Sequence, residues 1–149
     1  MNKAEQIIHA PAAAAGFCID DFNDVTTSEL VLKNPKTGQP TDIVLTLAGP
    51  EHPLRKKRQF ERIRRMRKEM QRVGKLTLAD PAEEEQDEGE FLAECILGWN
   101  KMPTRAGNVE FSRDAALQLM QDSERRWLRD QVKAGVEERE AFIASCAGS

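Results

Sequence analysis

The residue types that most often carry chemistry are sparse and widely separated in this 149-residue chain. The two histidines, His9 and His52, lie far apart, each close to a proline in a segment expected to be irregular. The three cysteines, Cys18, Cys95 and Cys146, form no CxxC pair. Neither a two-histidine metal site nor a thiolate site is indicated, and we expect the cysteines to be buried small hydrophobic residues.

The local motifs of nucleotide-binding and acyl-transfer enzymes are also missing from the sequence. It contains no Gly-rich phosphate loop and no nucleophile elbow of the form G-x-S-x-G. A histidine acting as a general base needs a group to deprotonate within hydrogen-bond reach, and no such partner lies near either histidine in the sequence. We therefore expect no catalytic residue, no metal and no cofactor, and predict that the protein is not an enzyme.

The most prominent chemical feature of this sequence is a concentration of positive charge in one segment. The stretch LRKKRQFERIRRMRKEMQRVGK, residues 54–75, holds eleven Lys and Arg against two Glu, a net charge of +9 in a chain whose formal net charge is −3. This basic segment could bind nucleic acid, because each phosphate neutralised releases counterions. No helix-turn-helix pair, zinc finger or aromatic stacking surface accompanies it, however, so base readout has no recognisable module.

An acidic segment follows closely. DPAEEEQDEGEFLAE, residues 80–94, contains eight Asp and Glu and no base, so it is a built-in competitor for the basic segment if the two fold back as neighbours. Three interpretations of the basic segment stay open: a structural or partner-facing helix, a helix neutralised by the acidic segment, and a nucleic-acid-binding helix. Charge runs are usually solvated helix faces, which favours the first.

The elements that position these segments begin with strands. In SELVLKNPKTGQPTDIVLTLAG, apolar residues alternate along two runs that are separated by the turn-forming stretch NPKTGQPTD. This pattern predicts a β-hairpin at about residues 28–48. An isolated hairpin is marginal in water, so these strands must pack on helices or extend another sheet.

Helical periods follow Gly49-Pro50. An apolar stripe in the basic segment, with spacings of 3, 3, 4 and 3, predicts a helix at about residues 51–73 that ends at Gly74. Start signals at Asp80-Pro81, Ser112 and Asp122 or Ser123 predict three more helices, at about residues 81–99, 113–121 and 123–145. The apolar stripe consists of Phe60, Ile63, Met66, Met70 and Val73.

Together these elements predict an α+β fold, a mainly α-helical small domain over residues 27–146 with an N-terminal β-hairpin. Residues 1–26 show no sustained period, and we expect a flexible or loosely docked arm. The composition, 40% hydrophobic, 32% charged and 5% aromatic, indicates a soluble protein with a thin core. No apolar run is long enough to span a membrane, and the early stretch HAPAAAAGFCI makes a poor export signal, so we expect a cytoplasmic protein.

Two stretches, considered with the order of these elements, suggest a family. NPKTGQPTD leads into LAGPEHP, and WLRDQV is followed by an EREAFI ending. In this combination the chain, over about residues 28–143, resembles the tail assembly chaperones of long-tailed bacteriophages. The resemblance implies a protein that binds the tail tape measure protein and assists assembly of the tail tube protein in the host cytoplasm, and that is absent from the mature virion. It implies no catalytic residue, and it leaves self-association open.

On this hypothesis two apolar surfaces are candidates for binding the partner. One is the apolar stripe, Phe60, Ile63, Met66, Met70 and Val73, although such a stripe is more often domain core than a binding surface. The other lies on the last predicted helix and comprises Trp127, Leu128, Val132 and Phe142. Two other functions are alternatives: a small nucleic-acid-associated protein that uses residues 55–75, and a structural tail component retained in the virion.

Overall fold

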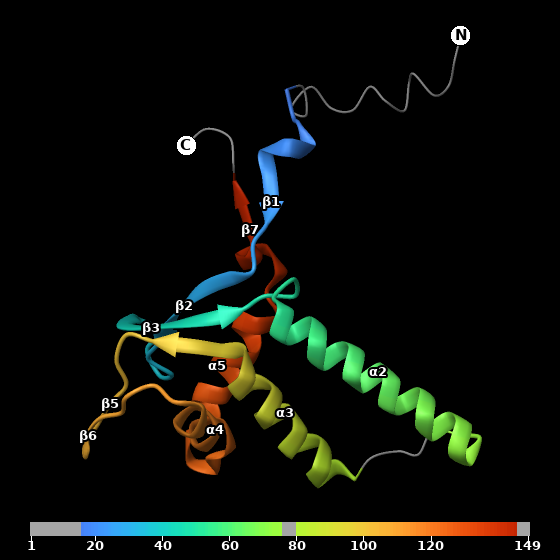
Figure 1. The fold of residues 1–149 in the computed structure, drawn as a ribbon. Helices are drawn as coiled ribbons and strands as arrows, with labels where there is room; N and C mark the ends of the chain where they lie inside the picture. Colours follow the sequence, from blue (N-terminus) through green and yellow to red (C-terminus); the bar gives the residue numbers. More distant parts are fainter. Residues whose placement is uncertain (1–15, 76–79, 146–149) are drawn as a thin grey trace.

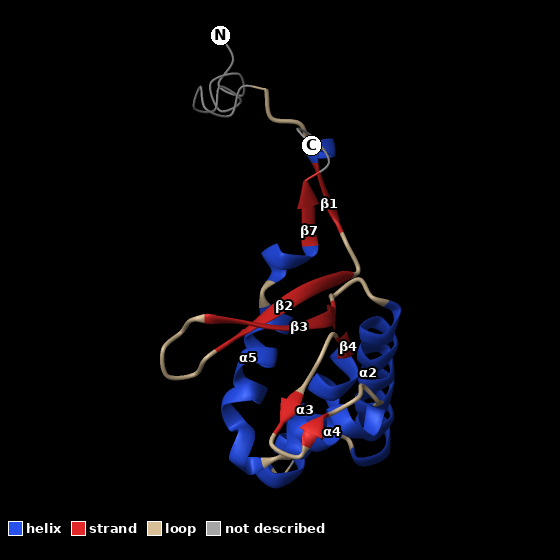
Figure 2. Cartoon of the chain, turned by 90° about the vertical axis from the view of Figure 1, so that its left-hand side faces the viewer, coloured by secondary structure: helices blue, strands red, loops and turns tan. Residues whose placement is uncertain are grey.

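The computed structural model describes residues 16–75 and 80–145 of the chain, and its fold is α+β, as predicted (Figure 1). A small antiparallel sheet is packed against helices, and a two-stranded ribbon stands apart from it (Figures 1 and 2). The helices are α2 (Pro53–Val73), α3 (Pro81–Cys95), α4 (Arg113–Gln121) and α5 (Arg126–Glu137), with short 3-10 turns η2 (Ile19–Asp21), η3 (Ser123–Arg125) and η4 (Arg139–Phe142). The strands are β1 (Phe22–Asp24), β2 (Thr27–Lys33), β3 (Pro40–Ala48), β4 (Ile96–Trp99), β5 (Pro103–Thr104), β6 (Gly107–Asn108) and β7 (Ile143–Ser145).

The predicted hairpin is confirmed as β2 and β3, which pair antiparallel. The turn between them is built by Asn34, whose Oδ1 accepts hydrogen bonds from the backbone N–H groups of Lys36 and Thr37 at 2.9 and 3.2 Å. Gly38 completes it at a φ of +73°, which favours glycine. The alternation in the sequence therefore placed the hairpin correctly, because turn chemistry and strand period agree there.

The third strand of the central sheet was not predicted. The expected helix over residues 81–99 is wrong beyond Cys95, where α3 ends and β4 pairs antiparallel with β3. Ile96 already has an extended backbone and pairs with Leu47, while Trp99 pairs with Leu45. The apolar residues of β4 continue the helical period of α3, so periodicity could not separate the two, and pairing with the hairpin decided the outcome.

The core lies between the inner face of the sheet and the helices α3, α4 and α5. Helix α5 packs against β2 and β3, and the side-chain amide of Gln131 on α5 forms two hydrogen bonds with the backbone of Lys33 at 2.9 and 2.8 Å. The predicted helix at 113–121 is confirmed as α4, with Ser112 as its cap. The buried core consists of Leu32, Leu45, Leu47, Leu92, Ala93, Cys95, Ile96, Met102, Ala116, Met120, Leu128, Val132, Val136 and Phe142.

The last predicted helix is also corrected. Instead of one helix over residues 123–145, the chain forms η3, α5, η4 and β7, with a break at Glu138. The break lets Phe142 turn into the core over Gly49, where a Cβ atom, if one were present, would lie 2.5 Å from the Phe142 Cδ1 atom. Burial of that ring and pairing of β7 with β1 outweigh the helical period here.

The ribbon of β1 and β7 projects beyond the sheet (Figures 1 and 2). Phe22 pairs with Ser145, and Asp24 pairs with Ile143. The described part of the predicted N-terminal arm thus includes a paired strand, whereas residues 1–15 lie outside the described residues. The stretch KLTL at residues 75–78, whose sequence could form a short extended piece, also falls largely on undescribed positions.

One charged side chain lies inside the core. Arg129 on α5 is 4% exposed, and its guanidinium donates to the backbone oxygens of Met120 at 3.2 Å and Glu85 at 2.7 Å. It also lies 3.5 Å from the Glu88 carboxylate, which Lys133 approaches to 3.2 Å. Helices α3, α4 and α5 are therefore joined at a single guanidinium.

Replacing Arg129 with alanine is expected to lower the free energy of unfolding by about 2–5 kcal/mol, because backbone acceptors on two helices lose their donor and the buried side chain leaves a cavity. Urea denaturation followed by circular dichroism measures this loss. Arg67→Ala is the matched control, since Arg67 lies on exposed α2, and a change within about 0.5 kcal/mol is expected. Equal losses for the two variants would contradict the role given to Arg129.

Candidate partner-binding surface

Helix α2 carries the basic segment and has well-defined ends. His52 is its cap, with Nδ1 accepting from the Leu54 backbone N–H at 3.1 Å, and Pro53 occupies the first turn. Gly74 ends the helix at a φ of +76°, and its N–H donates to the Met70 oxygen at 2.8 Å. The 21 residues extend about 31 Å. The predicted helix at 51–73 is thus confirmed to within two residues.

Among the described residues, the first turns of α2 are joined to the body of the protein by hydrogen bonds and an ion pair. Arg55 donates to the backbone oxygens of Ala48 and Val136, both at 3.2 Å. Arg58 pairs with the Glu94 carboxylate at 2.8 Å, and both guanidinium groups lie over the Phe91 ring, 5.6 and 5.7 Å from its centroid. The attachment is polar and cation–π in nature, and from there α2 and α3 diverge (Figure 1).

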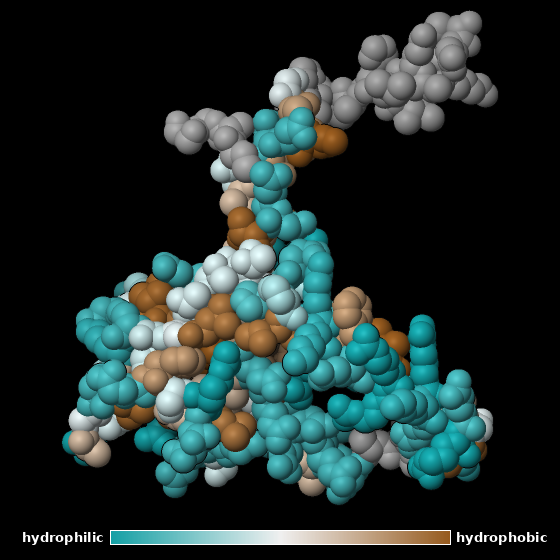
Figure 3. All heavy atoms as spheres, viewed as in Figure 1, coloured by the Kyte–Doolittle hydropathy of each residue, from teal (hydrophilic) through white to brown (hydrophobic). Residues whose placement is uncertain are grey.

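The apolar stripe of α2 is exposed along its whole length. No residue of the helix is buried, the Phe60 side chain is 51% exposed, and the other four members are between 38% and 44% exposed. The interpretation of the stripe as domain core is therefore wrong. In Figure 3 hydrophilic residues cover most of α2 as seen from that side, so the stripe is a narrow apolar strip on a charged helix.

Most residues of the second predicted contact surface, on the last predicted helix, are buried. Leu128, Val132 and Phe142 are 2%, 0% and 1% exposed and belong to the core under the sheet. They are inaccessible to a partner unless the protein unfolds, so placing them in a contact surface was wrong. Trp127 alone of that group is exposed, at 39%. The helical period put the four on one face, and that face of α5 is the one that packs on the sheet.

The acidic segment neutralises little of the basic segment. Glu94 pairs with Arg58, but Glu85 pairs with Arg126 on α5, and Glu88 with Arg129 and Lys133 on α5. The hydrogen bond from Arg126 lowers the pKa of the Glu85 carboxyl, which keeps it charged. Within the described residues, ion pairs join only two cations of the basic segment, Lys56 and Arg58, to a carboxylate. The self-neutralised interpretation thus fails, and most of the positive charge faces solvent.

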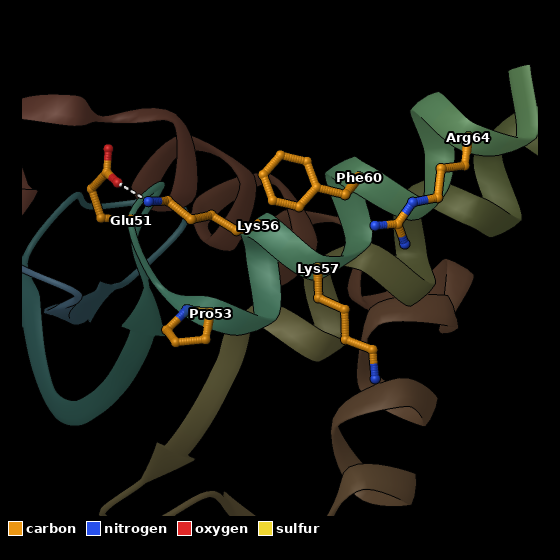
Figure 4. Close-up of a pocket in the computed structure, with 6 residues that line it drawn as sticks. All are labelled: Glu51, Pro53, Lys56, Lys57, Phe60 and Arg64. Carbon is orange, nitrogen blue, oxygen red and sulfur yellow. Dashed lines mark ion pairs between the residues drawn. The ribbon is translucent and has the colours of Figure 1, made fainter. Parts of the chain in front are cut away.

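A shallow, open hollow adjoins the start of the stripe (Figure 4). Lys56 is held at one end by the Glu51 carboxylate at 2.6 Å, and the Phe60 ring stands between the stems of Lys56 and Arg64. An apolar ring with ammonium and guanidinium groups around it suits a ligand with an apolar side chain and acidic neighbours. The residues lining the hollow are Glu51, Pro53, Lys56, Lys57, Phe60 and Arg64.

Other exposed apolar residues lie just before the ribbon in the sequence, on the ribbon itself and on the sheet. Phe17 and Ile19 are 63% and 83% exposed, and the Phe17 ring stacks on Phe22 with centroids 6.0 Å apart. Figure 3 shows hydrophobic residues on this ribbon and over the outer face of the sheet. The ribbon has no clear signal in the sequence, because β1 and β7 are three residues each and pair over a long sequence separation.

The cysteines and histidines show no arrangement typical of a catalytic or metal site where the structure describes them. Cys95 is buried, as expected, and burial raises the pKa of its thiol to about 11, so it is protonated and unreactive at neutral pH. Cys18 is exposed, contrary to expectation, while Cys146 and His9 lie outside the described residues. No cluster of three or more potential metal ligands occurs in the described part of the chain.

No described helix combines the length and apolarity needed to cross a bilayer. Comparison with known proteins gives no match to any protein family, curated protein or solved structure. A functional proposal therefore depends on the residues, their geometry and the resemblance noted in the sequence.

The exposure of the stripe gives a direct stability test with two methionines. Met66→Ala is expected to change the free energy of unfolding by less than about 0.5 kcal/mol, because Met66 is 41% exposed. Met120→Ala is expected to cost about 2–5 kcal/mol, because Met120 is 1% exposed and its removal leaves a cavity. Thermal or urea unfolding measures both, and a large loss for Met66→Ala would show that α2 is packed in solution.

Proposed function

We propose that the protein is a bacteriophage tail assembly chaperone that binds the tape measure protein through the apolar stripe of α2 and assists tail tube assembly. One observation supports this most directly: a 21-residue helix that buries none of its residues presents the five apolar side chains of the stripe to solvent, in addition to Leu54. Because these side chains are exposed, they contribute little to the stability of the described fold. An exposed apolar strip on a helix is the usual form of a helix-in-groove contact.

The charge around the stripe fits the same role. A chaperone for an aggregation-prone client must expose apolar contacts without aggregating itself, and the cations on α2 keep the helix solvated and repel other copies of it. The client in such a system is a long, largely helical chain whose own apolar stripes need cover before assembly. Many copies of a small protein, each binding weakly, would cover it through multivalency.

On this proposal the protein performs no catalysis, needs no cofactor and has no membrane partner. It acts in the host cytoplasm, together with the tape measure and tail tube proteins, and leaves before the virion is complete. The alternative is a structural tail component. Abundant peptides from this chain in mass spectra of purified virions would favour that alternative.

Co-expression with the tape measure protein of the same phage tests the proposal. The soluble fraction of the client is expected to rise several-fold with the wild-type protein, and to fall back with a variant carrying Ile63→Ser, Met66→Ser and Met70→Ser, because its stripe is no longer apolar. The client is measured by quantitative blotting of the soluble lysate.

The matched control for that experiment is Arg65→Gln with Lys68→Gln, which changes the opposite side of the same helix. It is expected to retain wild-type activity, and circular dichroism checks that both variants are folded. A client that is no more soluble with the wild-type protein than without it would end the proposal.

A nucleic-acid role is the second candidate, favoured by one observation. Glu85 and Glu88 of α3 pair with α5, and most cations of the basic segment have no ion-pair partner among the described residues. A phosphate-binding surface would show measurable affinity for duplex DNA at about 50 mM salt and a steep loss by about 200 mM. Such binding has no use for the apolar stripe, so the stripe-to-serine variant would bind DNA as the wild type does.

A further inference from the structure

The spacing within the apolar stripe defines the shape of what can cover it. Ile63, Met66, Met70 and Val73 follow intervals of 3, 4 and 3, which are the a and d positions of two heptads. A seam with this repeat packs along one other helix, because knobs at a and d fit the holes of a facing helix. Phe60 extends the apolar strip by one turn toward the hollow in Figure 4.

The positions flanking this seam define the charge of the covering helix. Arg67 lies beside it on the side of Phe60, and Arg62 and Glu69 lie beside it on the other. In paired helices these flanking positions face the flanking residues of the partner and select it by charge. With further cations one turn away and few carboxylates in reach, the surface is strongly positive along the seam. Acidic residues on the partner are the complement.

A second copy of this chain does not meet the requirement. Packing α2 on α2 would bring two segments of +9 together, and Glu69 is the one acidic flanking residue that could offset the repulsion between them. The acidic helix α3 has the right charge, but its apolar residues Leu92, Ala93 and Cys95 are buried in the core and offer no seam. Helices α4 and α5 also bury their apolar residues in the core, so the covering helix is not among the described elements of this chain.

Two other polyanions are poorer complements. Duplex DNA would satisfy the cations and leave the stripe in water. An anionic bilayer would contact both the cations and the apolar stripe. Binding to a bilayer does not require a two-heptad repeat with charged residues directly beside it, however.

We propose that α2 binds an acidic amphipathic helix, with apolar residues at heptad positions a and d and Asp or Glu in the flanking positions. This rests on the proposed function and names the chemical class of client segment that the stripe covers. The seam supplies the burial, and the Arg and Lys groups orient the incoming helix and exclude basic ones.

Three labelled peptides of about four heptads, titrated with the full-length protein, test this by fluorescence anisotropy. The first has Leu and Ile at a and d and Glu at the flanks, the second has the same seam with Lys at the flanks, and the third keeps Glu but has Ser at a and d. The first is expected to bind at least about tenfold more tightly than either of the others, and to weaken as salt rises from about 50 to about 200 mM.

Charge reversal on the protein sharpens the test. Arg62→Glu with Arg67→Glu is expected to lose about tenfold in affinity for the Glu peptide and to gain affinity for the Lys peptide. Arg65→Glu with Lys68→Glu makes the same change in net charge away from the seam and is the matched control, with a smaller loss and no gain for the Lys peptide. Circular dichroism confirms that each variant is folded.

Several outcomes would overturn the inference. Equal affinity for the Glu and Lys peptides would remove the charge selection, and equal affinity for the peptide with Ser at a and d would reduce the contact to charge alone. Tighter, stripe-dependent binding to anionic vesicles than to the Glu peptide would assign the surface to a membrane. If the Glu peptide does not bind but the tape measure protein still becomes more soluble in a stripe-dependent way, this inference is wrong and the proposed function stands. If the Glu peptide binds as expected but the tape measure protein is no more soluble, the proposed function is wrong and the preference for an acidic helix stands.

Discussion

The arrangement of this protein depends on the buried guanidinium of Arg129. It donates to the backbone of α4 at Met120 and of α3 at Glu85, and it lies against the Glu88 carboxylate. A buried charge is costly unless it is paired, so α3 and α5 are held with their charged sides in contact. Gly89 lets α3 approach this closely, since a Cβ there would lie 3.2 Å from the Arg129 Nη1 atom.

The contact of α3 with α5 around Arg129 affects how the basic helix α2 is placed. Glu85 and Glu88 of α3 pair with α5, and Arg58 with Glu94 is the one ion pair between α2 and α3 among the described residues. Helix α2 is held by Arg55 and Arg58 at its start, and none of its residues is buried. The positive charge and the apolar stripe of α2 are therefore both available to a binding partner, and one partner can contact them together.

Elements with unambiguous local signals were predictable. The hairpin had turn chemistry at Asn34 to Gly38, and α4 had its cap at Ser112, so both were predicted to within a residue or so. Prediction failed at Ile96–Trp99 and at Ile143–Ser145, where apolar residues continue a helical period but the chain pairs as β4 and β7. Strand pairing over long sequence separation leaves no local mark, so the stability of a distant partner strand outweighs propensity.

The sequence by itself determined where the helices start, that α2 is strongly basic, and that its apolar residues share one face. Only the tertiary structure decided which faces are buried. The stripes of α2 and α5 look alike as patterns, yet Val132 is 0% exposed while Val73 is 42% exposed. Periodicity determines which side chains lie on the same face of a helix, whereas burial requires a surface that covers that face. The sheet covers this face of α5, and it does not cover the stripe of α2.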